Sequence, residues 1–187
     1  MTKPTNVAFQ IARWIIAGFI AMTCASAFAQ PRYGLSPEAL AVFNRWVLAA
    51  CITDEERALV EDMRRYREPL AAAFRKAIVD GPSREELKDA RAAAEERYAT
   101  RAKFPIEQYA IEGVSRQDLA RFRRVSRQSY VDDQVKRFAT GYRANAVAGL
   151  GIVADPESRA ALARIANNRN DPLALAAREA LKTADRQ

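Results

Sequence analysis

The sequence contains no histidine and only two cysteines, at positions 24 and 51. The lack of histidine excludes His-based catalytic triads, His metal sites and His general bases. Glycine is also scarce, and no phosphate loop of the Walker or dinucleotide type occurs, because Gly149-Leu150-Gly151 lacks both the spacing and the context. We therefore predict a protein without a metal or an organic cofactor.

Alternation of apolar and polar residues, the mark of a half-buried strand, is missing over any convincing length. Apolar residues instead recur in steps of three and four, which is typical of amphipathic helices. We therefore predict an all-α fold built of helical hairpins.

Long apolar runs are absent as well, and the one near the N-terminus is short. Residues 14–25 (WIIAGFIAMTCA) would barely span a bilayer. Two bases and no acid precede this run, and ASAFA follows it, with small Ala27 and Ala29 at the −3 and −1 positions. This pattern predicts the signal peptide of an exported bacterial protein over residues 1–29, cleaved after Ala29 to give a periplasmic protein. An uncleaved membrane anchor is the alternative.

Removal of the signal peptide would leave Cys51 as the only cysteine. A lone thiol cannot form an internal disulfide, and no disulfide-linked partner is required. Cys51 lies in VLAACI, on an apolar helix face. We therefore expect a small buried hydrophobic residue rather than a reactive thiol.

The N-terminal part, residues 36–104, is predicted to form a layer of helical hairpins. Residues 30–35 (QPRYGL) should form an extended leader before it. Ser36 then suits an N-cap and Pro37 the first helical position, which begins a helix that should end near residue 51.

Two capping boxes introduce the next helices. Thr53–Glu56 and Ser83–Glu86 each place an acid three residues after a hydroxyl, which predicts helices over 54–80 and 84–103. Pro69 should kink the first of these helices or split it. We expect the two to pack together as an antiparallel hairpin.

The C-terminal part, residues 115–187, should form a second helical layer within a single compact domain. Residues 104–114 have no helical period and form a predicted hinge before it. The apolar pattern then predicts one helix over 115–129 and a longer one over 131–153.

An Asp-Pro pair occurs at 155–156 and again at 171–172. In each pair Asp can accept hydrogen bonds from the free N–H groups of a helix, and Pro suits the first helical position. We therefore expect helices over 156–166 and 172–183. The link between them, NNRN, is so short that they must pack as an antiparallel pair.

The segments NAVAGLGIVADP (145–156), AALARIANNRNDP (160–172) and AAREAL (176–181) together resemble the HEAT-like repeats of α-solenoids. The resemblance covers residues 142–182, or about one and a half repeats, and it includes no catalytic residue. It implies stacked helices at the C-terminus. An ordinary helical-bundle end with two good N-caps is the alternative.

Positive charge is concentrated in residues 116–143, which hold eight bases and three acids. Aromatic residues are interleaved with these bases, but their helical spacing indicates that they face the core. A basic field of this kind suits an anionic partner. The candidate contact residues are Arg121, Arg124, Arg127, Lys136 and Arg137.

These features favour a non-catalytic interaction or scaffold module that binds a protein partner in the cell envelope. A binder of an anionic lipid or polysaccharide is the alternative, and a solvated arginine-rich face without a ligand is also open. Export argues against nucleic acid as the partner. An enzyme is the least favoured class, because the paired carboxylates lie in first turns or on charged faces of helices. These pairs are Glu55/Glu56, Glu85/Glu86 and Glu95/Glu96.

Overall fold

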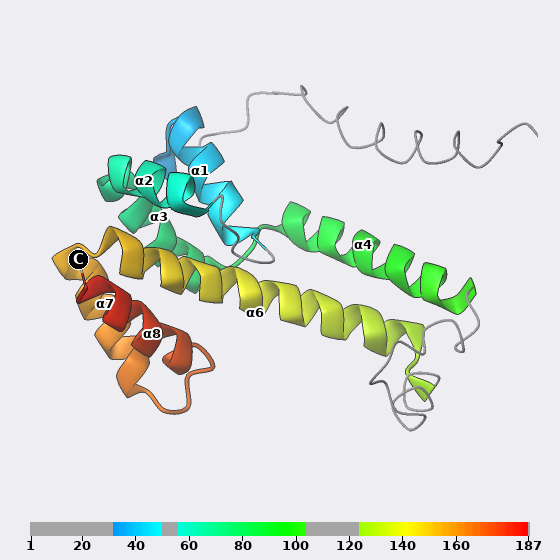
Figure 1. The fold of residues 1–187 in the computed structure, drawn as a ribbon. Helices are drawn as coiled ribbons and strands as arrows, with labels where there is room; N and C mark the ends of the chain where they lie inside the picture. Colours follow the sequence, from blue (N-terminus) through cyan, green and yellow to red (C-terminus); the bar gives the residue numbers. More distant parts are fainter. Residues whose placement is uncertain (1–31, 50–55, 104–123, 187) are drawn as a thin grey trace, which may run out of the picture. The chain divides into compact units, whose positions relative to one another are not determined.

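The computed structural model describes residues 32–49, 56–103 and 124–186, and these are α-helical with no strand among them (Figure 1). The predicted all-α class is confirmed. The described residues all belong to one unit, residues 31–187, which is separate from residues 1–30. Its elements are η4 (Arg32–Gly34), α1 (Pro37–Val47), α2 (Glu56–Arg65), α3 (Arg67–Asp80), α4 (Arg84–Lys103), α6 (Arg127–Val153), α7 (Pro156–Asn167) and α8 (Ala174–Ala184).

Several predictions lie outside the described residues. They are the signal peptide at 1–29, the buried Cys51, the cap at Thr53, the hinge at 104–114 and the part of the 115–129 helix that includes Arg121. Among the described residues, no helix is both long enough and apolar enough to cross a bilayer.

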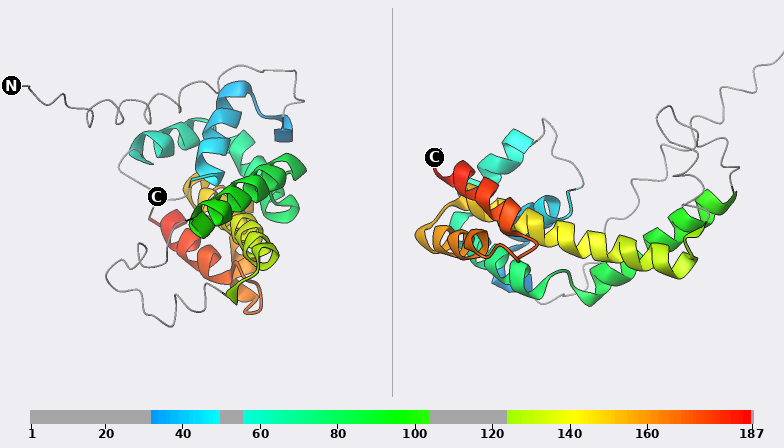
Figure 2. Two further views of the ribbon diagram at one scale, coloured as in Figure 1. Left: turned by 90° about the vertical axis from the view of Figure 1, so that its right-hand side faces the viewer. Right: turned by 90° about the horizontal axis from the view of Figure 1, so that it is seen from below.

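Helix α6 is the central element, because it contacts each of the other six α-helices described (Figures 1 and 2). Its C-terminal half carries fully buried Val147 and Leu150. These pack in one core with residues from both sides of segment 104–123, among them Phe74 of α3 and Leu162 of α7. The core therefore surrounds the C-terminal half of α6.

The start of α6 corrects one predicted boundary. The Ser126 hydroxyl accepts a hydrogen bond from the Ser129 N–H at 3.1 Å, and the helix begins at Arg127. Residues 127–129 were assigned to a separate helix, but they form the first turn of α6. The Ser126 cap is what sets the boundary there.

The expected break near Pro69 is confirmed. Helix α2 ends at Arg65 and α3 begins at Arg67, so Pro69 is the third residue of α3. Proline has no N–H, and its ring clashes with the carbonyl four residues earlier, which is that of Arg65. One continuous helix is therefore excluded at this point.

The expected pairing of helix 84–103 with helix 54–80 is wrong. Helix α4 packs beside the N-terminal half of α6 instead, and the two run antiparallel (Figure 1). The turn after α3 explains part of this path, because Gly81 has a φ of 73° and Pro82 follows it. The small side chain of Ala94 explains the rest, since it is buried against Tyr130 and Val131 of α6.

The leader also differs from its prediction. Residues 32–34 form a 3-10 turn rather than an extended segment, and Tyr33 and Gly34 both have positive φ angles. The Tyr33 ring packs edge-on against Phe43 with ring centroids 5.3 Å apart. Leu35 is buried in the core. This packing holds the turn in place.

At the C-terminus, the first Asp-Pro prediction is confirmed and the second holds only in part. The Asp155 carboxylate accepts a hydrogen bond from the Ser158 N–H at 2.7 Å, and α7 begins at Pro156. Asp171 accepts from the Leu173 N–H at 2.8 Å, but α8 begins at Ala174, two residues after Pro172. Helices α7 and α8 pack together as the expected pair.

Candidate functional site

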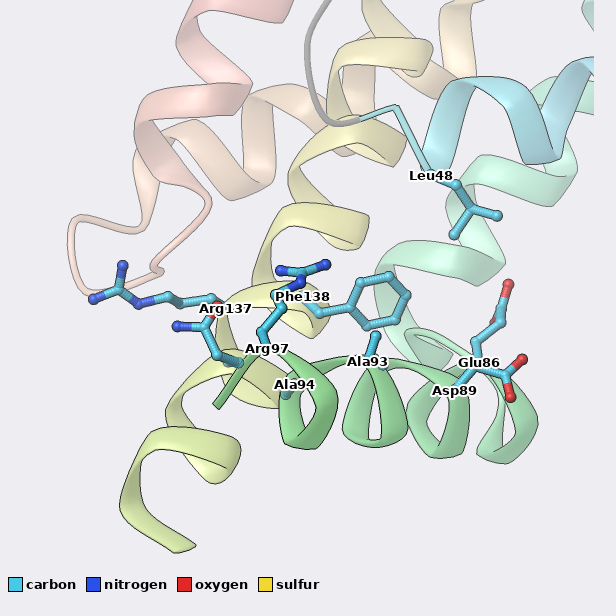
Figure 3. Close-up of a pocket in the computed structure, with 10 residues that line it drawn as sticks. Leu48, Glu86, Asp89, Ala93, Ala94, Arg97, Arg137 and Phe138 are labelled. Carbon is cyan, nitrogen blue, oxygen red and sulfur yellow. The ribbon is translucent and has the colours of Figure 1, made fainter. Parts of the chain in front are cut away.

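A groove of about 460 Å³ lies between α4 and the facing part of α6 (Figure 3). We call it the α4–α6 groove. Most of its residues come from α4, three come from α6, and Leu48 comes from the end of α1. They are Leu48, Glu86, Asp89, Ala90, Ala93, Ala94, Arg97, Gln134, Arg137 and Phe138.

The groove owes its geometry to the start of α4 and to its contacts with α6. The backbone N–H of Ser83 donates to the Glu86 carboxylate, and the Glu86 N–H donates to the Ser83 hydroxyl at 3.2 Å. This is the reciprocal capping box expected from the sequence. Further along, Arg91 pairs with Asp132 at 3.0 Å, which joins the two helices beside the groove.

The floor of the groove is apolar and made mostly of small side chains. Three alanines of α4 supply it, and the Phe138 ring reaches it from α6 (Figure 3). Leu48 borders the same space and remains 47% exposed, which is unusual for a large apolar side chain in this unit. Small residues leave room for another chain's side chains, and an exposed apolar surface with a polar rim is typical of interaction sites.

The rim of the groove has acids toward one end and bases toward the other (Figure 3). Glu86 and Asp89 lie near Leu48, whereas Arg97 and Arg137 lie farther along the helices. Among the described residues, Asp89, Arg97 and Arg137 have exposed side chains without an ion pair. These three charges therefore remain available to a ligand.

Glu86 is not available in this way, because its carboxylate holds the N-terminal turn. Arg32 Nη1 donates to Glu86 Oε1 at 2.6 Å, and the Arg32 guanidinium also lies over the rings of Tyr33 and Tyr142. Burial raises the pKa of Glu86, but hydrogen bonds from Arg32 and Ser83 outweigh this effect and leave the pKa below its usual value. Glu86 therefore stays ionised at neutral pH as part of the scaffold.

The structure does not gather the five predicted contact residues into one site. Arg137 lines the α4–α6 groove, whereas Arg127 forms an ion pair with Glu95 at 3.1 Å. Arg124 and Lys136 are exposed but do not line the groove, and Arg121 lies outside the described residues. Only Arg137 thus contributes to the groove.

The interleaved aromatic residues behave as expected. Tyr130 and Tyr142 are buried and Phe138 is half-buried, while Phe122 lies outside the described residues. Sequence reasoning missed Arg97 and Leu48 as groove residues. Their positions depend on which helix packs beside α4, and helical periodicity alone does not identify that neighbour.

The carboxylate pairs give no converging acid-base site in the described residues. Glu86 is bound by Arg32, Glu95 pairs with Arg127, and their neighbours Glu85 and Glu96 are exposed. Within the same residues, no group of three or more Cys, Asp or Glu side chains is placed to hold a metal ion.

Comparison with known proteins adds no assignment: neither a protein family, nor a curated protein, nor a solved structure matches this chain.

Proposed function

We propose that this chain is a non-catalytic interaction module, exported to the periplasm, that binds a peptide segment of a protein partner in the α4–α6 groove. The observation that carries the proposal is the combination of an apolar floor with opposite charges at the two ends of one groove. Neither the floor nor the rim is needed to build the core, which surrounds the other half of α6.

The charges specify the chemistry of the ligand. A segment that fits this groove has small apolar side chains facing the alanines and Phe138. It carries an acid where it meets Arg97 and Arg137, and a base where it meets Asp89. Complementary charges of this kind fix the direction of a bound peptide and reject reversed ones, which gives specificity more than raw affinity. Peptides bound in grooves of this type use a few apolar anchors in the same way.

Peptide display with a charge-reversed groove tests this proposal. The full-length chain selects binders from a random peptide library, and the R97E/R137E variant selects in parallel. We expect wild type to enrich peptides that pair small apolar residues with an acid. The variant should enrich a base at the same position, because like charges face each other unfavourably across an interface.

The K88E/K136E variant is the matched control. It makes the same charge change on the same two helices, and both lysines are exposed but outside the groove. It should select the same peptides as wild type. Identical selections by all three proteins would exclude the groove as the binding site.

Export is a separate part of the proposal. The observation behind it is the signal-peptide pattern of residues 1–29. Mass spectrometry of the protein recovered from a periplasmic fraction should find an N-terminal peptide that begins at Gln30. A chain that retains Met1, or that stays in the cytoplasm, would exclude this part while leaving the groove untested by that measurement.

An anionic envelope polymer or lipid is the second candidate ligand. The exposed side chains of Arg124 and Lys136 favour it, because they are not neutralised by ion pairs within the described residues. The two functions differ in their response to salt. Binding to a polyanion through exposed bases should weaken steeply as salt rises, whereas peptide binding that includes apolar contacts should weaken less.

A further inference from the structure

We propose that four arginines at the other end of α6 form a binding site for a phosphate group. They line a cavity of about 740 Å³, together with the last residues of α6. We call this cavity the arginine groove. Its residues are Arg64, Arg67, Ile152, Val153, Ala154, Arg159 and Arg186.

These arginines come from segments that are far apart in the sequence. Arg64 lies near the end of α2 and Arg67 at the start of α3, whereas Arg159 lies in α7 and Arg186 follows α8. The fold brings them together at the C-terminal end of α6. The site is therefore separate from the α4–α6 groove, which borders the N-terminal half of α6, and the proposal does not depend on that groove.

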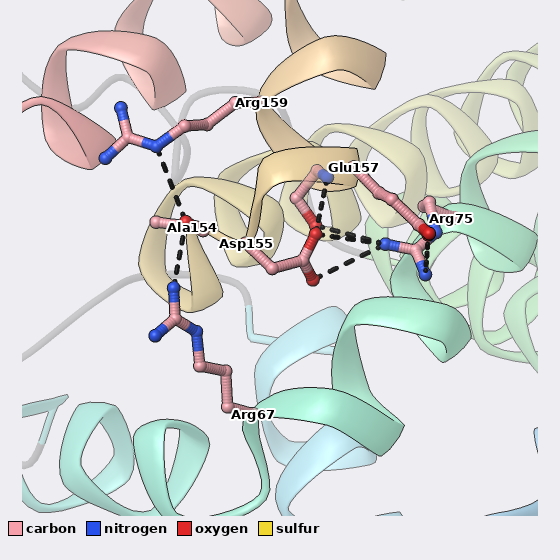
Figure 4. A network of polar contacts seen from close by, with 7 residues as sticks. Arg67, Arg75, Ala154, Asp155, Glu157 and Arg159 are labelled. Atoms are coloured by element: carbon pink, nitrogen blue, oxygen red, sulfur yellow. Dashed lines mark hydrogen bonds and ion pairs between the residues drawn. The ribbon is translucent and has the colours of Figure 1, made fainter.

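Two of the guanidinium groups are held in place by one backbone carbonyl (Figure 4). The Ala154 oxygen accepts a hydrogen bond from Arg67 Nη2 at 2.9 Å and another from Arg159 Nε at 3.4 Å. Arg159 also donates to the Ala184 carbonyl and to the Asp185 carboxylate. Arg67 retains further N–H donors, since a guanidinium carries five. Groups fixed in this way lose little freedom when they bind a ligand.

Acids near the groove are turned away from it or already paired. Arg75 binds Asp155 at 3.4 Å and Glu157 at 3.0 Å, on the far side of Ala154 from Arg67 and Arg159 (Figure 4). Arg159 pairs with Asp185 and Arg64 pairs with Glu61. No carboxylate lines the groove, so Arg67 and Arg186 keep an uncompensated positive charge among the described residues.

Capping of α6 explains only part of this arrangement. Arginines near a helix C-terminus stabilise its free carbonyls and the negative end of its dipole. That role accounts for Arg67 and Arg159, which bind the Ala154 carbonyl. It does not account for Arg64 and Arg186, because neither donates to a carbonyl of α6 among the described residues.

A phosphate group is the ligand that such a cluster suits best. The planar guanidinium fork binds two phosphate oxygens at once, and several forks together satisfy a doubly charged oxyanion. The phosphate can belong to a small soluble molecule or to a lipid headgroup, and both sources present the same chemistry to the arginines.

Titration calorimetry with inorganic pyrophosphate tests the site in the full-length chain at low salt. The test variant is R64Q/R186Q, because these arginines have exposed side chains and no contact with the α6 carbonyls. The control is R164Q/R169Q, which removes the same charge from exposed positions outside the groove. Loss of charge-assisted hydrogen bonds should weaken pyrophosphate binding in the test variant by about tenfold or more. The control should bind as wild type does.

Sedimentation with phosphatidylglycerol vesicles, compared with neutral phosphatidylcholine vesicles, distinguishes the two sources. The apolar segment at residues 14–25 is common to every variant, so only differences between variants count. A groove-dependent loss of pyrophosphate binding alone supports a soluble phosphate ligand. A groove-dependent loss of vesicle binding supports a lipid headgroup. If the test variant matches the control in both assays, or if wild type binds neither probe, the proposal is overturned.

Discussion

The two halves of α6 lie in very different surroundings. From Tyr142 to Val153, the helix is packed by α1, α3, α7 and α8 and contributes to the main core. From Arg127 to Phe138, it is packed chiefly by α4, and the buried cluster there contains only Ala94, Tyr130 and Val131. The same continuous helix therefore joins a densely packed region to a thinly packed one.

This difference separates stability from binding. Stability follows the apolar area that is removed from water, and most of that area lies around the C-terminal half of α6. The N-terminal half is joined to α4 by a small cluster and by exposed ion pairs, which contribute little. Regions with few buried contacts open most readily and are where ligand-binding elements are usually found. The α4–α6 groove lies in that region.

The largest expected effect is that of L150A in the core half of α6. Leu150 is fully buried, so the substitution removes buried methyl groups and leaves a cavity. We expect the free energy of unfolding to fall by about 2–5 kcal/mol. Urea denaturation followed by circular dichroism measures this loss. Y98A in the α4 cluster is the comparison, because Tyr98 is only half-buried. An equal loss from Y98A would mean that the two halves are equally important for stability.

A second prediction uses two glycines of α6 and expects effects of opposite sign. A Cβ at Gly151 would lie 2.6 Å from the Ala180 carbonyl oxygen, so α6 and α8 would have to move apart in G151A. Overpacking of this kind costs about 1–3 kcal/mol. Gly141 has no atom within 4 Å of its Cβ position, so G141A should instead stabilise the helix by about 0.5–1 kcal/mol. Thermal unfolding of both variants checks the pair, and a stabilised G151A would contradict the close packing of α8.

The third prediction concerns Glu86, which connects the N-terminal turn to α4. Its pKa is lowered in the folded state, so its contribution to stability is present above its ordinary pKa of 4.5 and is lost as the pH falls through the folded-state value. E86Q keeps the capping geometry but removes the charge that binds Arg32. We expect E86Q to cost about 1 kcal/mol at neutral pH.

The pH dependence distinguishes charge from packing in this variant. The difference between wild type and E86Q should shrink as the pH falls below 4.5, because wild-type Glu86 is then protonated as well. Urea denaturation over that range measures the difference. A gap that stays constant with pH would show that the lost contact is not the ion pair.

Sequence predicted those features that depend on residues close together in the chain. The caps at Ser36, Ser83 and Asp155 join a side chain to a backbone N–H three residues later, so a short motif contains both partners. The break near Pro69 is equally local, because it follows from the missing N–H and the ring of one residue.

Features that depend on tertiary pairing were not predictable in this way. The stripe that includes Ala94 indicates that some helix packs closely on α4, but it does not say which one, and the expected neighbour was wrong. Charge density identified Arg137 and Lys136 equally, although only Arg137 lines the groove. The arginine groove unites Arg64 with Arg186, and no local pattern links positions so far apart.

The smallest expected effect is that of E95Q, which breaks an ion pair between α4 and the N-terminal half of α6. Glu95 and Arg127 are 43% and 64% exposed, so water and salt screen their attraction. The cost should be about 0.2–1 kcal/mol, too small to locate by global unfolding. Hydrogen exchange measured by mass spectrometry can locate it, because exchange reports local opening.

We expect E95Q to speed exchange in α4 and in residues 127–138, while residues 142–153 exchange as slowly as in wild type. High salt should reduce the difference, since it already weakens the pair in the wild-type protein. Faster exchange along the whole of α6 would instead mean that the helix opens as a single unit. The thinly packed half would then not be an independent element, and a ligand in the α4–α6 groove would stabilise the whole protein rather than that half alone.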